Sequence, residues 1–107
     1  MNVITNDNIT CTIALTALQN VIDPEINLNI VDLGLIYEID FNEPNSKIYI
    51  AMTLTTPFCP MGESITGAVK RVLENIFTGM EIQLELTFNP IWSYERISEE
   101  GRKFLNQ

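Results

Sequence analysis

The sequence predicts an α+β fold, a two-layer sandwich in which two helices cover one face of a small mixed sheet. Three observations support this prediction. Apolar residues recur at helical spacing in two segments, they alternate with polar residues in three others, and the five segments follow in the order α, β, β, α, β. Because each segment is apolar on one side only, packing both helices on the same face of the sheet buries all the apolar sides together.

The first helix is expected to begin at a capping residue among positions 6–8, where asparagine and aspartate can accept hydrogen bonds from the first turn. Asp23-Pro24 is expected to end it. The apolar stripe of this helix consists of Cys11, Leu15, Leu18 and Ile22. Since Cys11 lies on that stripe, it is expected to be a buried core residue.

Residues 23–34, named here the acidic loop, show neither helical nor strand spacing. The loop carries three carboxylates, Asp23, Glu25 and Asp32, and it ends at Gly34, where a positive φ or a close backbone contact would require glycine. Each carboxylate taken alone is explained by turn formation or solvation. Together they can offer ligands to iron, or tune a thiol, if the loop folds over the start of the second helix.

Three strands and a second helix follow. A hairpin with one buried face is expected over residues 35–41 and 48–54, and the third strand, the clearest of the three, over residues 80–88. The second helix lies between the hairpin and the third strand. It is expected to start near Met61 and to end at Gly79. This crossover is long enough for a parallel strand pair, so a mixed sheet is predicted. The tail holds Trp92, Tyr94 and a short helix over residues 98–105.

Cys59 lies where the strand pattern stops and the helical pattern starts. Pro60 suits the first helical position, which makes Cys59 the N-cap of the second helix. The free N–H groups at that end carry about half a positive charge and favour a thiolate, whereas the carboxylate of Glu63 opposes it. The hydroxyls of Thr55 and Thr56 lie close by in sequence. The alternative is a small, inert, buried cysteine.

Composition narrows the function classes. The chain has 107 residues, a length expected for a single domain over residues 1–107 with a core of about 10–105. A net charge of -8 disfavours nucleic acid and anionic membranes as partners. No apolar run approaches about 18 residues and the N-terminus lacks a signal-peptide pattern, so a soluble cytoplasmic protein is expected. With two cysteines and no histidine, a soft-metal site must take ligands from elsewhere.

Several motifs in this order are typical of one family. They are Asp23-Pro24-Glu25, residues 29–36 with Val31-Asp32-Leu33-Gly34, Met52-Thr53-Leu54-Thr55, Cys59-Pro60, and Asn89-Pro90 with Trp92. Over about residues 10–105 the chain resembles the PaaD and SufT-like small domain, the domain of unknown function numbered fifty-nine. The resemblance implies a fold akin to the C-terminal domain of NifU-type scaffolds and a role in maturing or delivering iron-sulfur clusters. The family's reactive cysteine falls on Cys59 and its acidic motif on Asp23, Glu25 and Asp32.

We therefore expect an assembly or delivery factor and no enzyme. Cys59 is expected to bind a transient iron-sulfur cluster, with Thr55, Thr56, Asp23, Glu25 and Asp32 around it. NifU-type domains carry a CxxC that this chain lacks, so a homodimer, a small thiol or a recipient protein would complete the roughly four ligands. The expected partners are assembly or client proteins.

Two alternatives stay open at this stage. One is an interaction module that recruits clients through its acidic face, Trp92 and Tyr94, since aromatic residues are enriched at binding hot spots. The other is a thiol redox enzyme, suggested by the spacing of Thr56 and Cys59. Such enzymes usually need an arginine to activate the thiol, and their thioredoxin-like fold needs a larger chain.

Overall fold

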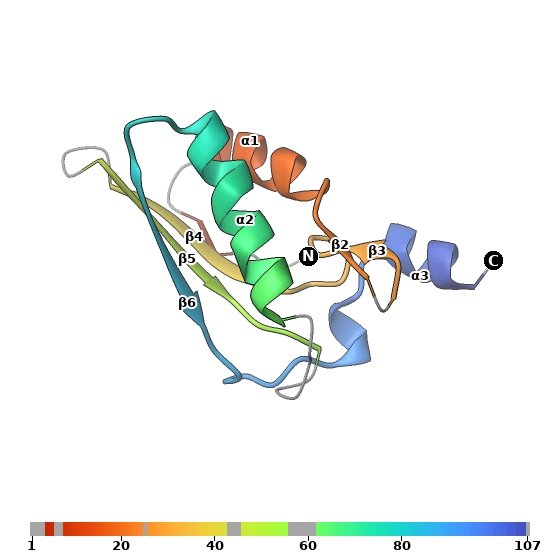
Figure 1. Cartoon of the computed structure of the whole chain (residues 1–107). Helices are drawn as coiled ribbons and strands as arrows, with labels where there is room; N and C mark the ends of the chain where they lie inside the picture. The colour runs from red at the N-terminus through yellow and green to blue at the C-terminus, as the bar shows by residue number, and fades with distance from the viewer. Residues whose placement is uncertain (1–3, 6–7, 25, 43–45, 56–61, 107) are drawn as a thin grey trace.

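The computed structural model describes residues 4–5, 8–24, 26–42, 46–55 and 62–106. Its architecture is the predicted α+β sandwich, with helices on one face of a mixed sheet (Figure 1). The strands are β1 (Ile4–Thr5), β2 (Ile22–Asp23), β3 (Leu28–Asn29), β4 (Ile36–Asn42), β5 (Lys47–Met52) and β6 (Glu81–Leu86). The helices are α1 (Asn8–Leu18), α2 (Gly62–Ile76), the 3-10 turn η1 (Tyr94–Arg96) and α3 (Glu99–Leu105).

The main sheet has the strand order β1-β4-β5-β6. Strands β4 and β5 form the predicted antiparallel hairpin, which runs from the pair Ile36 and Met52 to the pair Asn42 and Lys47 with a bulge after Ile36. Strand β6 lies parallel to β5, and β1 lies parallel to β4. The crossover through α2 therefore produces the mixed sheet that the sequence predicts.

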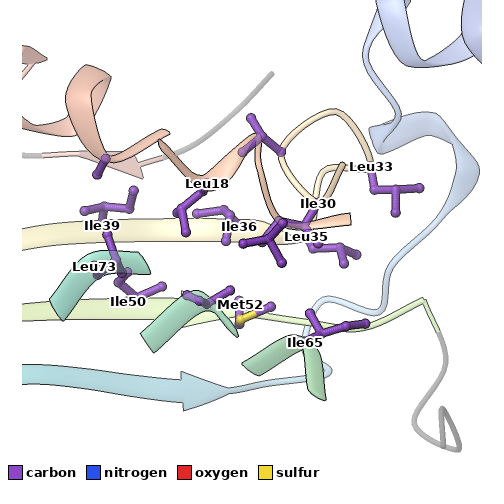
Figure 2. Packing of buried hydrophobic residues seen from close by; sticks show 14 of the residues in the cluster. Leu18, Ile30, Leu33, Leu35, Ile36, Ile39, Ile50, Met52, Ile65 and Leu73 are labelled. Carbon is purple, nitrogen blue, oxygen red and sulfur yellow. The ribbon is translucent and has the colours of Figure 1, made fainter. Parts of the chain in front are cut away.

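The core lies between the sheet and the helices α1 and α2. Figure 2 shows side chains from both helices meeting those of β4 and β5. The fully buried members include Leu18, Leu73, Ile39, Ile50 and Met52. Burying an aliphatic side chain of this size contributes about 1.5–3 kcal/mol, so this layer holds the helices against the sheet. Cys11 is also buried here at 2% exposure, as predicted.

Helix α1 ends earlier than the sequence pattern predicts. It stops at Leu18, where the side chain of Asn20 donates to the carbonyl of Ala17, and the chain then enters the short strand β2. Ile22, predicted on the buried stripe, is instead 47% exposed. Two consecutive β-branched residues, Val21 and Ile22, favour a strand over another helical turn.

Part of the acidic loop is a strand pair. Strands β2 and β3 pair in antiparallel register, with Ile22 opposite Asn29 and Asp23 opposite Leu28. The turn between them uses a positive φ of 64° at Asn27, and the N–H of Asn27 donates to the carbonyl of Asp23 at 2.7 Å. Asparagine tolerates this conformation better than most residues. The prediction of an irregular loop from residue 23 is therefore wrong in its first part.

The short C-terminal helix begins where the sequence predicts. Ser98 is the N-cap of α3, and its hydroxyl accepts a hydrogen bond from the N–H of Gly101 at 3.0 Å. The last strand ends at Leu86, and residues 87–106, named here the C-terminal segment, cross the end of the sheet to reach β2 and β3 (Figure 1). Among the described residues, no helix has the length and apolar character that crossing a bilayer requires.

Candidate functional site

The candidate site is the junction between β5 and α2. Cys59 and Thr56 lie outside the described residues, so their predicted roles are not addressed by the coordinates. The residues on either side of positions 56–61 are in contact. A Cβ added to the buried Gly62, at the start of α2, would lie 2.8 Å from the Cδ1 of Leu54. Thr55, half-buried, follows Leu54. The strand end and the helix start are thus held close together.

Residues 20–24, which lead into the acidic loop, lie over the first turns of α2. A mainly apolar cavity of about 280 Å³ separates the two. Its lining residues are Asn20, Val21, Ile22 and Pro24 from the loop side and Ser64, Ile65, Ala68 and Val72 from α2. Asp23, within this stretch, is buried at 1% exposure. Glu25 lies outside the described residues. The structure therefore brings the Asp23 region next to the helix that follows Cys59.

Asp32 belongs to a different set of contacts. Its Oδ1 accepts a hydrogen bond from the hydroxyl of Ser98 at 2.7 Å, and its Oδ2 accepts one from the amide of Asn29 at 2.7 Å. The backbone is joined as well, since the N–H of Ser98 donates to the carbonyl of Asp32 at 2.8 Å. Asp32 thus connects the acidic loop to the N-terminus of α3.

The C-terminal segment also holds the residues that follow Asp32. The indole N–H of Trp92 donates to the carbonyl of Leu33 at 2.6 Å, and the Nε of Arg96 donates to the carbonyl of Gly34 at 2.8 Å. The Arg96 guanidinium lies 4.2 Å above the ring of Tyr37. A contact of this kind is worth about 0.5–1 kcal/mol at exposed sites and more when desolvated.

Gly34 allows the backbone of Arg96 to pack closely against the acidic loop. Its φ is +77°, and a Cβ at this position would lie 2.5 Å from the backbone oxygen of Arg96. Both reasons foreseen for a glycine here, the positive φ and the close backbone approach, therefore hold. The half-buried Trp92 has a partner for its indole N–H, the carbonyl of Leu33.

Three residues of this network have no signal as site residues in the sequence: Tyr37, Arg96 and Ser98. Ser98 is recognisable as a helix cap because acidic residues follow it. Its partner Asp32 is 66 positions away, and no local pattern joins the two. Within the described stretches, no group of three or more cysteine and carboxylate residues has the arrangement of a metal site.

This chain is similar to known proteins of iron-sulfur cluster assembly. The model of the family described as "Iron-sulfur cluster assembly protein" matches residues 13–84. The Fe-S protein maturation auxiliary factor YitW of Bacillus subtilis is 35% identical over 80% of this chain and 83% of its own length. The corresponding factor SufT of Staphylococcus aureus is 36% identical over 77% of this chain and 92% of its own.

A longer relative and two solved structures are also similar to this chain. An iron-sulfur cluster carrier protein of Mycobacterium leprae is 32% identical over 66% of this chain, which spans only 19% of that protein. A crystal structure of a domain of unknown function, DUF59, from Bacillus anthracis has a TM-score of 0.83 and 38% identity over 89% of this chain and 90% of that one. A conserved hypothetical protein from Thermotoga maritima has a TM-score of 0.73, also at 38% identity, over 88% of this chain and 91% of that one.

Proposed function

This chain belongs to the iron-sulfur cluster assembly protein family, and on that premise we propose that it delivers iron-sulfur clusters through the thiolate of Cys59. It is a factor for iron-sulfur cluster assembly or delivery, like the maturation auxiliary factors that it is similar to. The observation that carries the proposal is the junction of β5 and α2, where Leu54 and Gly62 are in contact on either side of the segment that contains Cys59.

The small number of cysteine ligands in this chain favours a cluster that is passed on over one that the protein keeps. The whole sequence has two cysteines and no histidine, and Cys11 is buried in the core. Cys59 is therefore the one thiol per chain left as a candidate ligand, whereas a cluster takes about four ligands. A second copy, a small thiol or the recipient protein supplies the others in this proposal. Incomplete ligation makes the cluster easy to release, which suits delivery better than retention for electron transfer.

The neighbouring polar residues have different proposed roles. Asp23 and Glu25 belong to the part of the acidic loop near α2, and with Thr55 and Thr56 they are proposed to surround the cluster or tune the thiol. For Asp32 we propose a supporting role, because both of its carboxylate oxygens already accept hydrogen bonds. It fixes the loop that carries the other two acids.

The wider role is a non-enzymatic one in this proposal. The partners are assembly or client proteins, and the reducing conditions of the cytoplasm would keep the thiol available. A single domain over residues 1–107 is also proposed, and it is supported by one hydrophobic cluster that includes side chains from Cys11 to Ile97.

Anaerobic reconstitution with iron and sulfide tests the role of Cys59. The wild-type protein should take up both and show a charge-transfer absorption band, and Cys59→Ser should lose them. Cys11→Ser is the matched control, because Cys11 is buried and should leave the loading per folded molecule unchanged. Native mass spectrometry would report whether one or two chains hold each cluster. Equal loading of Cys59→Ser and wild type would remove Cys59 from the mechanism.

A second function is favoured by the surface of the C-terminal segment. Ile91 and Tyr94 are 68% and 54% exposed, and aromatic residues such as Tyr94 are enriched at binding hot spots. An interaction module that recruits clients without touching the cluster would use these side chains. Capture of an apo client by Cys59→Ala at wild-type affinity, with loss in Tyr94→Ala, would support recruitment over delivery.

A further inference from the structure

Strand β6 leaves one edge of the main sheet unpaired. The sheet order places β5 on one side of β6, and no strand in the described part of the chain pairs with its other side. The register with β5 continues without a bulge from Glu81 to Leu86. Natural edges are often protected by proline, a bulge or charged side chains; β6 has no proline and no bulge, and its two charged residues, Glu81 and Glu85, are both negative. The strand is therefore a template to which another strand can be added.

The backbone groups on this edge belong to alternate residues. The N–H of Glu81 donates to the carbonyl of Ser46, and that of Thr87 donates to the carbonyl of Met52, so both point toward β5. Because the direction alternates along a strand, the N–H and C=O groups of Ile82, Leu84 and Leu86 point outward. These are the groups that an added strand would bond.

The side chains of β6 specify what that strand should contain. On the sheet face away from the helices, Glu81, Gln83 and Glu85 are exposed. Glu81 lies 3.9 Å from Lys47, and Glu85 accepts a hydrogen bond from the hydroxyl of Tyr49 at 3.1 Å. Two further carboxylates, on Glu38 and Asp40 of β4, share this face because they pair with Ala51 and Tyr49. The face therefore attracts positive charge.

The other face of β6 is apolar and partly uncovered. Its end residue Leu86 is 42% exposed, and Leu84 is half-buried. Figure 1 shows β6 as the outermost strand of the sheet, beside β5 and to one side of α2. An added strand would cover these leucines with its own apolar side chains. It would place its alternate residues beside Glu81 and Glu85.

A second copy of this chain does not fit the edge well. Pairing two β6 strands would bring the carboxylates of Glu81 and Glu85 from both copies onto one face of a continuous sheet. Like charges on neighbouring strands are destabilising, whereas opposite charges are stabilising. Charge complementarity therefore favours a partner with basic residues.

We propose that the outer edge of β6 binds an extended segment of a partner protein in which lysine or arginine alternates with apolar residues. The segment adds a fifth strand to the sheet, its backbone bonded to Ile82, Leu84 and Leu86 and its basic side chains beside Glu81 and Glu85. This docking edge does not involve Cys59. It would therefore operate whether or not the proposed cluster chemistry is correct.

A pair of synthetic peptides tests the proposal on the full chain. One peptide alternates valine with lysine, and the other alternates valine with glutamate. Wild type should bind the lysine peptide, and Glu81→Lys/Glu85→Lys should prefer the glutamate peptide. Because each cross-strand charge pair has a modest effect, Glu81→Gln/Glu85→Gln should bind the lysine peptide about two- to thirtyfold more weakly. The matched control Glu74→Lys/Glu100→Lys makes the same change in net charge away from the sheet and should keep the wild-type preference.

Amide hydrogen exchange identifies the mode of binding. With the lysine peptide bound, exchange should slow at Ile82, Leu84 and Leu86 and change little at Gln83 and Glu85, whose N–H groups point toward β5. The proposal is overturned if protection does not alternate, if the control variant changes preference as strongly as the β6 variant, or if the peptide does not bind. Cys59→Ser should bind as wild type does, which separates this result from the test of cluster loading.

Discussion

The start of the acidic loop, together with the two residues before it, has different surroundings from the second half of the loop. Residues 21–24 lie against the first turns of α2 across a cavity, whereas residues 29–34 are bonded to the C-terminal segment. Each stretch carries a described aspartate. Asp23 is buried within the first of these stretches, and Asp32 accepts a hydrogen bond from the hydroxyl of Ser98, the N-cap of α3. A carboxylate near a candidate site in sequence can thus have a structural role, and only its contacts distinguish the two cases.

The largest effect that tests this contrast is expected at Gly34. Gly34→Ala should lower the free energy of unfolding by about 2–5 kcal/mol, because alanine strains the positive φ and its Cβ would lie 2.5 Å from the Arg96 backbone oxygen. Gly79→Ala is the matched control. Its φ is +87° with nothing within 4 Å of the added Cβ, so about 1 kcal/mol is expected. Urea unfolding of both variants measures the difference.

Equal losses at the two glycines would contradict the structure. The difference between them reports the contact with the C-terminal segment, since the backbone strain is common to both. A Gly34→Ala protein that unfolds as easily as Gly79→Ala would mean that the segment does not press on the acidic loop in solution.

The bond between Asp32 and Ser98 should give the next largest effect. Ser98→Ala removes both this bond and the cap of α3, and a loss of about 1–3 kcal/mol is expected. Asp32→Ala should cost a similar amount. A double-mutant cycle isolates the pair, and the coupling between the two changes should exceed about 0.5 kcal/mol. Additive effects would show that the hydrogen bond contributes nothing of its own.

Cluster loading sharpens the same contrast. We expect Asp32→Asn to keep the wild-type iron and sulfide content per folded molecule, and Asp23→Asn to lower it. The reason is the proposed division of roles between the half of the loop beside α2 and the half bonded to α3. Loading that falls for Asp32→Asn and not for Asp23→Asn would reverse the assignment.

Single hydrogen bonds to the C-terminal segment should have smaller effects. Trp92→Phe removes the donor to the carbonyl of Leu33, and about 0.5–1.5 kcal/mol of stability should be lost. Tyr37→Phe removes the donor to the carbonyl of Pro90 at 2.7 Å but keeps the ring below Arg96, so a loss in the same range is expected. Urea denaturation of each variant is the measurement. A stability unchanged in both would indicate that water replaces these bonds without cost.

The sequence predicts most of the fold because the responsible signals are local. The alternation in β4, β5 and β6, the apolar stripe of α2 and the short helix from Ser98 each depend on residues within one element. Gly34 also carries a local signal, since a positive φ requires it. The end of α1 and the pairing of β2 with β3 were missed because Val21 and Ile22 also continue a helical stripe, and only a partner strand decides between the two.

The candidate site is less predictable for a different reason. The sequence suggests Cys59 and the acids as site residues, but the contacts of Asp32 depend on a residue 66 positions away. The approach of residues 21–24 to α2 depends on the packing of two helices and a strand pair. Such long-range contacts leave no periodic pattern in one sequence. Composition gives the ligand types, and the tertiary structure decides which of them meet.

The smallest expected effect concerns Tyr49, on the sheet face away from the helices. Desolvation, the hydrogen bond to Glu85 and the negative charges of Glu85 and Glu38 raise the pKa of Tyr49 above its ordinary value of 10.0. A group with a raised pKa contributes stability that is fully present below the unfolded pKa and is lost as the pH rises through the folded pKa. Urea unfolding from about pH 8 to pH 11 should therefore show an alkaline loss of stability that is smaller in Tyr49→Phe.

Glu85→Gln is the variant that distinguishes the cause of this shift. Removing the carboxylate removes both the charge beside the phenol and its charged hydrogen-bond acceptor, so the pKa of Tyr49 should fall toward its ordinary value and tyrosinate should form at a lower pH. Difference absorbance against Tyr49→Phe follows this group alone among the tyrosines. An unchanged titration in Glu85→Gln would mean that Glu85 does not contact Tyr49 in solution. It would also weaken the case for a carboxylate row along β6, on which the proposed docking of a basic strand depends.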